Sequence, residues 1–339
     1  MEQSFSSHAI APAAVLRGEG AWSEALPRIR ALCSRPLLLG RSTSTSRLRH
    51  HLKADLSAAG LAPASAELRF DCCERDLTHL RLEAQPCDAV IAAGGGKVLD
   101  AGKLLAHRLS LPCITVPLSA ATCAGWTALS NIYSPEGAFE SDVSLNRCPD
   151  LLVFDHTLVR QAPPRTLASG VADALAKWYE ASVSSADSSD GLVQQAVQMA
   201  RVLRDQLLID SPAAMEDINS PAWVRTAEAC ALTAGVMGGL GGARCRTVAA
   251  HAVHNGLTQL PACHDALHGE KVGFGILVQL RLEERMGGNR LAAQAHRQLL
   301  PLLRQLGLPV CLDDLGLAQA SLSDLQQVCS FACSKPYGY

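Results

Sequence analysis

The sequence has few aromatic residues, almost no net charge and no long apolar run. Phe, Trp and Tyr make up 4% of the 339 residues, and 30 basic side chains nearly balance 32 acidic ones. Because no stretch is strongly basic, the composition argues against a nucleic-acid-binding protein. Because no tail is strongly acidic, it also argues against an acidic segment that stays in solvent. The apolar runs fall far short of the roughly 20 residues that a membrane-spanning helix needs. The composition is that of an ordinary globular protein.

Thirteen cysteines are present, but their arrangement predicts neither disulfides nor a metal site. They are scattered and odd in number, and no C-x-x-C pair occurs, which argues against a disulfide framework and a zinc ribbon. The N-terminal residues contain no charged segment followed by an apolar one, so no signal peptide is visible. We therefore expect a protein of the reducing cytoplasm.

The chain divides near residue 160 into two regions that differ in composition and hydrophobic periodicity. In the first region, short apolar runs alternate with helical stretches, which predicts βαβ units and a mostly parallel sheet. The four runs are 36–40, 88–93, 112–117 and 151–155. After Pro163-Pro164 the sequence is rich in Ala, Leu and Gln with a period near 3.6, which predicts helices. We expect an α/β domain over residues 1–160 and an all-helical domain over 161–339, with a ligand cleft between them.

A triple glycine, Gly94-Gly95-Gly96, separates the second apolar run from a helical stretch. Glycines let the backbone approach a ligand closely, and the N-terminus of a helix offers N–H groups to an anion such as a pyrophosphate. The spacing is not G-x-G-x-x-G, so an ordinary tight turn remains the alternative. Asp100 and Lys103, one turn further on, either face the rest of a cofactor or form an ordinary exposed pair.

Four histidines gather within eighteen residues, among small apolar side chains. They are His251, His254, His264 and His268. Imidazole is the commonest metal ligand in proteins, and a catalytic site needs three protein ligands with one position open. Asp173 is a candidate third ligand, because a carboxylate in an apolar helical stretch needs a partner. Lys177, four residues later, could be that partner instead.

Together and in this order, these motifs resemble the iron-containing alcohol dehydrogenase superfamily, in its glycerol dehydrogenase branch. The resemblance implies the α/β-plus-helical fold of that family, a nucleotide-binding N-terminal domain, and a divalent metal bound by the helical domain. By position it implies metal ligands Asp173, His251 and His268. It also implies a nucleotide site of Gly95, Gly96, Lys97, Leu118, Thr127, Leu129 and Tyr133, which Asp100 would join from its place on the helix face. A homo-oligomer is expected, with no nucleic-acid or membrane partner.

Several positions depart from the glycerol dehydrogenase pattern. Cys123 stands where that branch has an aspartate that binds the polyol, and Trp126 adds bulk nearby. Lys177 replaces a threonine and Arg246 replaces a glycine. The loss of an acid and the gain of two cations fit a substrate that carries a carboxylate. These departures resemble hydroxycarboxylate dehydrogenase A, a superfamily member that reduces 2-oxo acids.

We therefore expect hydride transfer between NAD(P)H and the carbonyl of a small 2-oxo acid. Arg246 and Lys177 would hold the carboxylate, and His254 is a candidate for relaying the proton. A glycerol or polyol dehydrogenase is the alternative, followed by a dehydroquinate synthase-like lyase or an inactive nucleotide-binding protein. The lyase would need a broader set of phosphate-binding basic residues, which the sequence does not offer.

The same residues suggest which metal and which cofactor are preferred. With Lys177 where iron-dependent branches have a histidine, three protein ligands remain, so zinc is expected before iron. The first predicted strand ends at Gly40-Arg41 with no acid, although an acid there would bind the adenosine ribose and repel a 2′-phosphate. We therefore expect NADP(H) to be preferred over NAD(H), with Gly40 and Arg41 at the cofactor.

Overall fold

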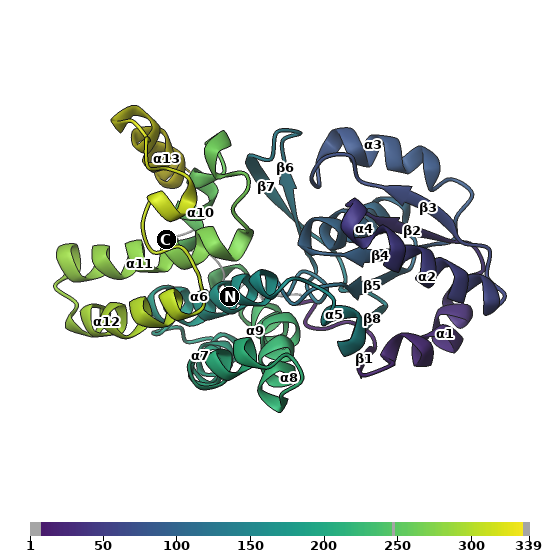
Figure 1. Ribbon diagram of the computed structural model, residues 1–339, viewed down its shortest axis with the longest axis horizontal. Helices are drawn as coiled ribbons and strands as arrows, with labels where there is room; N and C mark the ends of the chain where they lie inside the picture. The colour runs from purple at the N-terminus through teal and green to yellow at the C-terminus, as the bar shows by residue number, and fades with distance from the viewer. Residues whose placement is uncertain (1–7, 246–247, 335–339) are drawn as a thin grey trace, which may run out of the picture.

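The structure is a computed structural model that describes residues 8–245 and 248–334. Figure 1 shows two lobes, a sheet flanked by helices and a bundle of helices, with a small hairpin between them. The six-stranded sheet has the order β1-β8-β5-β4-β2-β3, and every neighbouring pair is parallel. Its strands are β1 (Val15–Gly18), β2 (Pro36–Gly40), β3 (Ala64–Glu67), β4 (Ala89–Gly94), β5 (Cys113–Pro117) and β8 (Leu151–Asp155). The predicted mostly parallel sheet is confirmed.

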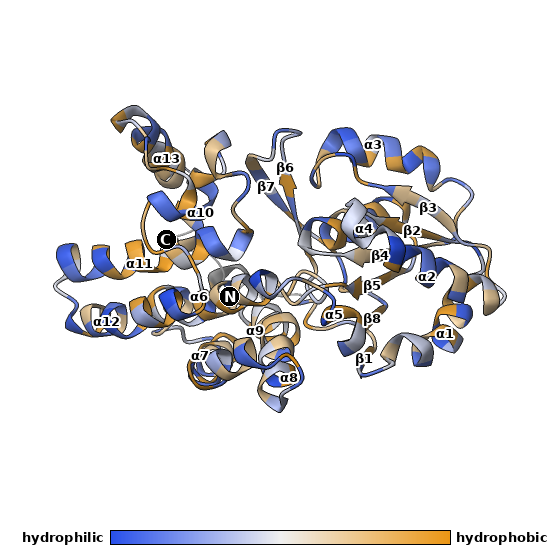
Figure 2. Ribbon diagram, in the orientation of Figure 1, coloured by the Kyte–Doolittle hydropathy of each residue, from blue (hydrophilic) through white to orange (hydrophobic). Residues whose placement is uncertain are grey.

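Helices cover both faces of this sheet. They are α1 (Ala21–Leu32), α2 (Ser46–Ala58), α3 (Glu74–Glu83), α4 (Gly96–Leu109) and the short α5 (His156–Val159). Alternate residues of a strand point to opposite faces. Accordingly, Ile91 packs with α1 and α2, whereas Val90 and Ala92 pack with α3 and α4. Strand β4 is therefore buried on both faces and reads as one apolar run, as Figure 2 shows for the central strands.

The two edge strands escaped prediction. Strands β1 and β3 are four residues long, and most of their residues are only half-buried or exposed. An edge strand with solvent on one side carries a weak apolar signal over so few residues. The pairing that makes them strands comes from β8 and β2, which are distant in sequence.

The second lobe is helical, as predicted. Its helices are α6 (Pro164–Ser184), α7 (Gly191–Glu216), α8 (Pro221–Glu228), α9 (Ala234–Gly241), α10 (Ala249–Leu257), α11 (His268–Gly287), α12 (Arg290–Gln305) and α13 (Leu322–Ser334). A π-helical turn, Ala229–Thr233, joins α8 to α9. Short 3-10 turns occupy Thr43–Thr45, Gly242–Cys245, Pro261–Cys263 and Asp313–Leu315. None of the described helices is both long enough and apolar enough to cross a membrane.

Helix α6 lies at the centre of the helical lobe and is buried along most of its length. Small residues let its neighbours approach closely. A Cβ on Gly269 of α11 would lie 1.8 Å from the carbonyl oxygen of Ser169, and one on Gly170 would lie 1.9 Å from that of Ala120. These contacts bring α11, and the loop after β5, against the face of α6 that carries Asp173.

The hairpin of β6 (Leu129–Tyr133) and β7 (Phe139–Ser144) joins the two lobes. The backbone N–H of Phe139 donates to Oγ1 of Thr258, at 2.9 Å, and Nε2 of Gln259 donates to the carbonyl of Phe139, at 3.1 Å. The hairpin is thereby attached to the end of α10. It forms one side of the cleft between the lobes.

Candidate metal and nucleotide site

A cleft of about 820 Å³ lies where the sheet meets the helical lobe. Strands β2 and β4 end at it, and so does the loop after β5. Helices α6, α9, α10 and α11 form the opposite wall. The chain leaves β2 toward one edge of the sheet and β4 toward the other, and ligands of open α/β sheets bind at such a point, beyond the carboxyl ends of the strands.

Three side chains from three helices converge at the base of the cleft. Asp173 comes from α6, His251 from α10 and His268 from α11. Oδ1 of Asp173 lies 3.4 Å from Nε2 of each histidine. Among the described residues, these three form the one group of His, Cys, Asp or Glu arranged to hold a metal, with donor atoms within 4.8 Å of one another.

The donor set fits a tetrahedral divalent ion. Ligand atoms bound at about 2.1 Å in a tetrahedron lie about 3.4 Å apart, which is the separation of the aspartate oxygen from each imidazole nitrogen. One carboxylate oxygen and two imidazole nitrogens leave a fourth position for a substrate or water. The arrangement can therefore hold a catalytic ion.

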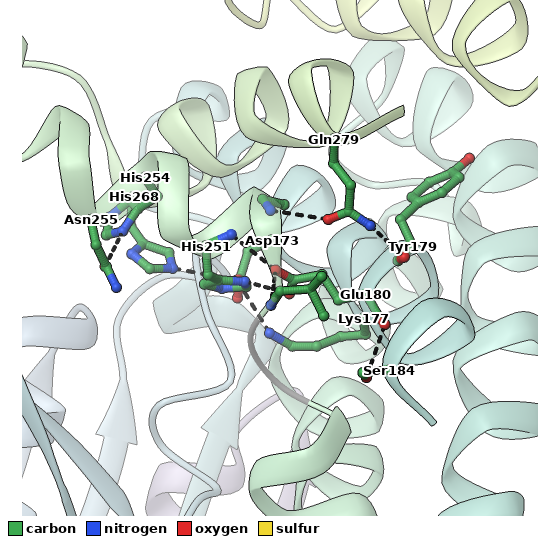
Figure 3. A network of polar contacts seen from close by, with 12 residues as sticks. Asp173, Lys177, Tyr179, Glu180, Ser184, His251, His254, Asn255, His268 and Gln279 are labelled. Carbon is green, nitrogen blue, oxygen red and sulfur yellow. Dashed lines mark hydrogen bonds and ion pairs between the residues drawn. The ribbon is translucent and has the colours of Figure 1, made fainter. Parts of the chain in front are cut away.

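Glu180, which the sequence analysis missed, orients one of these ligands. Its side chain is fully buried, and Nδ1 of His251 lies 2.6 Å from its Oε2 (Figure 3). Burial alone would lower the pKa of His251, but the carboxylates of Glu180 and Asp173 outweigh it and raise that pKa to about 9. A spacing of seven residues from Asp173 places Glu180 on the same face of α6. This seven-residue spacing was the feature of the sequence that could have pointed to Glu180.

Lys177 is buried beside the same aspartate. Its Nζ lies 3.3 Å from Oδ1 of Asp173, at the cleft wall, as the sequence spacing allowed. Burial opposes the charge of Lys177, but the carboxylate of Asp173, with a smaller contribution from Glu180, outweighs burial and raises the lysine pKa. Cys123 also lines the cleft, and burial raises the pKa of its thiol. A buried cation therefore stands beside the metal ligands, with a neutral thiol near it.

His254 lines the cleft next to the ligand histidines. Its ring centroid lies 4.2 Å from that of His268, and its Nδ1 lies 2.8 Å from Oδ1 of Asn255. Burial lowers the pKa of His254 well below its usual value, so the ring is neutral. By contrast, His264 lies apart from the three ligands, with its Nε2 3.1 Å from the carbonyl of Thr258.

The triple glycine lies at the cleft, at the N-terminus of α4. Gly95 is the N-cap residue, and a Cβ on Gly96 would come within 3.2 Å of Thr122. Lys103 and Asp100 are buried rather than exposed, with Nζ to Oδ1 at 3.1 Å. Lys103 also donates to the carbonyl of Thr127, at 3.0 Å, so this pair fastens α4 to the segment before the hairpin. Burial raises the pKa of Asp100.

Most of the residues expected at the nucleotide line the cleft. They are Arg41, Gly95, Gly96, Lys97, Asp100, Thr127, Leu129 and Tyr133. Asp71, which the sequence analysis did not single out, forms ion pairs with both Arg41 and Lys97. It lies in the segment between β3 and α3, so its position depended on the fold.

Three expected residues lie away from the cleft lining. A Cβ on Gly40 would overlap the side chain of Arg49, and Leu118 packs in the core shared with α1 and α2. Trp126 is buried against Gly235, and its indole N–H donates to the carbonyl of Ile10, at 3.0 Å. A bulky apolar side chain here fills the core rather than the substrate space. Arg246 lies outside the described residues.

Comparisons with known proteins agree with this geometry. A family model of the iron-containing alcohol dehydrogenases matches residues 12–156. An uncharacterized oxidoreductase of Synechocystis sp. is 52% identical over 334 residues, which cover 98% of this chain and 86% of the relative. The glycerol dehydrogenase of Escherichia coli O6:H1 is 33% identical over 318 residues, or 91% of this chain and 84% of the relative.

Hydroxycarboxylate dehydrogenase A of Escherichia coli K12 is also similar, at 38% identity over 221 residues, or 63% of this chain and 61% of the relative. The match with the glycerol dehydrogenase spans both lobes and confirms the family expected from the motifs. The chain therefore belongs to the iron-containing alcohol dehydrogenase family, in its glycerol dehydrogenase-like branch, and is an oxidoreductase of CH–OH groups from a family that binds NAD(P) and a divalent metal.

Proposed function

We propose that the protein transfers hydride reversibly between NAD(P)H and the carbonyl of a small 2-oxo acid. The observation that carries this proposal is the buried ammonium of Lys177, at the cleft wall and 3.3 Å from the ligand Asp173. A carboxylate next to the reacting carbonyl would lie within reach of this charge. Cys123, which also lines the cleft, offers no anion that would repel it.

The charge balance at the site supports an anionic substrate. A divalent ion, Lys177, Asp173 and Glu180 together would carry one net positive charge, with both histidines neutral as ligands. A substrate carboxylate would cancel that charge on binding, whereas a polyol would leave it in a largely buried site until its hydroxyl loses a proton, and an uncompensated buried charge is costly. A hydrogen bond between an ammonium and a carboxylate is also among the stronger kinds.

The chain's own residues have distinct roles in the proposed reaction. Asp173, His251 and His268 hold the ion, and Lys177 orients the carboxylate so that the carbonyl faces the nicotinamide. When bound, a divalent ion supplies a Lewis acid for the carbonyl oxygen, and the nicotinamide supplies the hydride. His254 is the proposed proton relay, because it lines the cleft beside His268 and its Nδ1 is engaged by Asn255.

We propose that residues 1–160 bind the nucleotide and that residues 161–339 hold the metal and the substrate. We further propose that NADP(H) is preferred over NAD(H) and that zinc is preferred over iron. Arg41, Ser42 and Thr43 line the cleft beyond the end of β2, as does Glu67, so a 2′-phosphate there would meet one cation, two hydroxyls and one carboxylate. Glu67, at the end of the neighbouring β3, is paired with Arg49. The three-ligand set with an open position is that of zinc enzymes.

A polyol dehydrogenase is the second candidate, and the similarity to a glycerol dehydrogenase over 91% of this chain favours it. Oxidation and reduction of the cofactor, followed at its absorbance band with 2-oxo acids, neutral ketones and polyols, distinguish the two. We expect the highest kcat/KM with a 2-oxo acid. Efficient glycerol oxidation without turnover of any 2-oxo acid would reverse this ranking.

A further inference from the structure

Glu180 is a buried carboxylate with three polar partners, all at the start of helix α10. Its Oε2 lies 2.6 Å from Nδ1 of His251. Its Oε1 accepts hydrogen bonds from the backbone N–H groups of Val248, at 2.8 Å, and of His251, at 2.9 Å. The side chain is 0% exposed, so these contacts replace water entirely. Figure 3 shows Glu180 reaching from α6 to this helix.

The N-cap residue of helix α10 provides no side-chain cap. This residue is Val248, whose hydrocarbon side chain cannot accept a hydrogen bond. The first N–H groups of a helix have no partner within it and carry part of the positive end of its dipole. Glu180 therefore supplies, from another helix, the acceptor that a Ser or Asp normally provides at this position.

The same carboxylate also determines which nitrogen of His251 can bind a metal. A carboxylate only accepts hydrogen bonds, so the shorter of the two carboxylate contacts of this ring, from Nδ1 to Glu180 at 2.6 Å, places the proton of a neutral ring on Nδ1. In a neutral imidazole this leaves the lone pair on Nε2, the atom that lies 3.4 Å from Oδ1 of Asp173. The tautomer of His251 that can bind a metal is thus the one that Glu180 selects.

We propose that Glu180 is a positioning residue that fixes the metal-binding tautomer of His251 and anchors the start of α10 with the same carboxylate. Ring and helix are then held as one unit, so that Nε2 keeps its direction toward the other two ligands. This inference rests on the proposed metal set of Asp173, His251 and His268. It does not depend on which substrate the enzyme reduces.

Glu180→Gln tests the proposal because it reverses one hydrogen bond and keeps the others. The amide oxygen can still accept from the two backbone N–H groups, and its NH₂ then faces His251. An NH₂ donor requires Nδ1 to accept, which moves the ring proton to Nε2, the ligating atom. The opposite amide orientation would leave both backbone N–H groups facing a donor, so it loses more hydrogen bonds.

The first measurement is the affinity for Zn²⁺, by competition with a chelating dye. We expect E180Q to bind Zn²⁺ about 10- to 100-fold more weakly than the wild type, the usual effect of removing the partner of a ligating histidine. The second is ¹⁵N NMR of the metal-free protein, at a pH at which the ring of His251 is neutral. There we expect protonated Nδ1 in the wild type and protonated Nε2 in E180Q.

Gln279→Met is the matched control. Oε1 of Gln279 accepts from the backbone N–H of Ala250, at 3.0 Å, so this variant also weakens the start of α10 but leaves the ring of His251 untouched. We expect Q279M to lower Tm, to keep Zn²⁺ affinity within about twofold of the wild type and to retain the Nδ1 proton. Glu180→Asp, which keeps an acceptor-only carboxylate, should also retain that proton, and it serves if E180Q does not fold.

Three results would overturn the proposal. One is E180Q with wild-type Zn²⁺ affinity, and another is an Nδ1 proton that persists in E180Q. The third is Q279M losing as much affinity as E180Q, since the effect would then be a general loosening of α10. A wild type that binds no divalent ion would instead refute the metal site, while the NMR measurement would still decide the role of Glu180.

Discussion

Replacing Lys177 with methionine is expected to weaken catalysis with 2-oxo acids far more than catalysis with neutral ketones. Methionine keeps roughly the length and volume of lysine and removes only the charge. A hydrogen bond to a charged group contributes about 1.5–3 kcal/mol. If this interaction is present in the transition state, its loss lowers kcat/KM for a 2-oxo acid roughly 10- to 150-fold.

The assay compares two substrates of the same carbon skeleton, a 2-oxo acid and the hydroxyketone in which CH₂OH replaces the carboxylate. K177M also removes the partner of Asp173, so part of its effect is shared by both substrates. The ratio of the two kcat/KM values cancels that shared part. The enzyme is assayed with saturating Zn²⁺, so that any weakening of metal binding does not contribute.

Lys271→Met is the matched control for this experiment. Lys271 is also a buried lysine, but its Nζ contacts the carbonyls of Cys263, at 3.1 Å, and Ala266, at 2.5 Å, rather than the cleft. We expect K271M to leave the substrate ratio unchanged. Equal falls for both substrates in K177M would refute the carboxylate-binding role and leave Lys177 as a partner of Asp173 alone.

Three further predictions follow from the structure. Arg41→Ala should raise KM for NADPH about tenfold while leaving KM for NADH nearly unchanged; equal changes for both would contradict a 2′-phosphate contact. Chelation should lower Tm and abolish turnover, and Zn²⁺ at about 100 times its Kd should restore about 2.7 kcal/mol of stability; a Tm indifferent to Zn²⁺ would count against the site. Burial lowers the pKa of Lys271 from 10.5 to about 8, so the unfolded chain binds more protons there and stability rises between those pH values. Measured by urea unfolding, the free energy of unfolding of the wild type should rise over that window by up to about 3 kcal/mol more than that of K271M. The same pH dependence of stability in both proteins would contradict the lowered lysine pKa.

Local patterns in the sequence predicted the main elements, and together with the family resemblance they predicted the ligand set. The apolar run that became β4 is buried on both faces, so its composition alone indicated a central parallel strand. The small-residue stretch around Asp173 and the histidines 251 and 268 carried the metal prediction through their types and spacing. Within one helix or strand the backbone period fixes which residues share a face, but bringing Asp173, His251 and His268 together required three helices to pack.

Contacts between elements were decided only by the tertiary structure. Trp126 was expected at the substrate, but the close approach of α9 at Gly235 places it in the core. Asp100 and Lys103 form an ion pair, as their spacing allowed. The pair was expected at the surface, but the hairpin segment covers it, and Lys103 also binds the carbonyl of Thr127 there. Glu180 could be connected to the site only by its seven-residue spacing from Asp173, because its role exists only where α6 meets the start of α10. Sequence periodicity fixes the face of each helix, but which faces meet, and at what rotation, depends on packing among residues far apart in the chain.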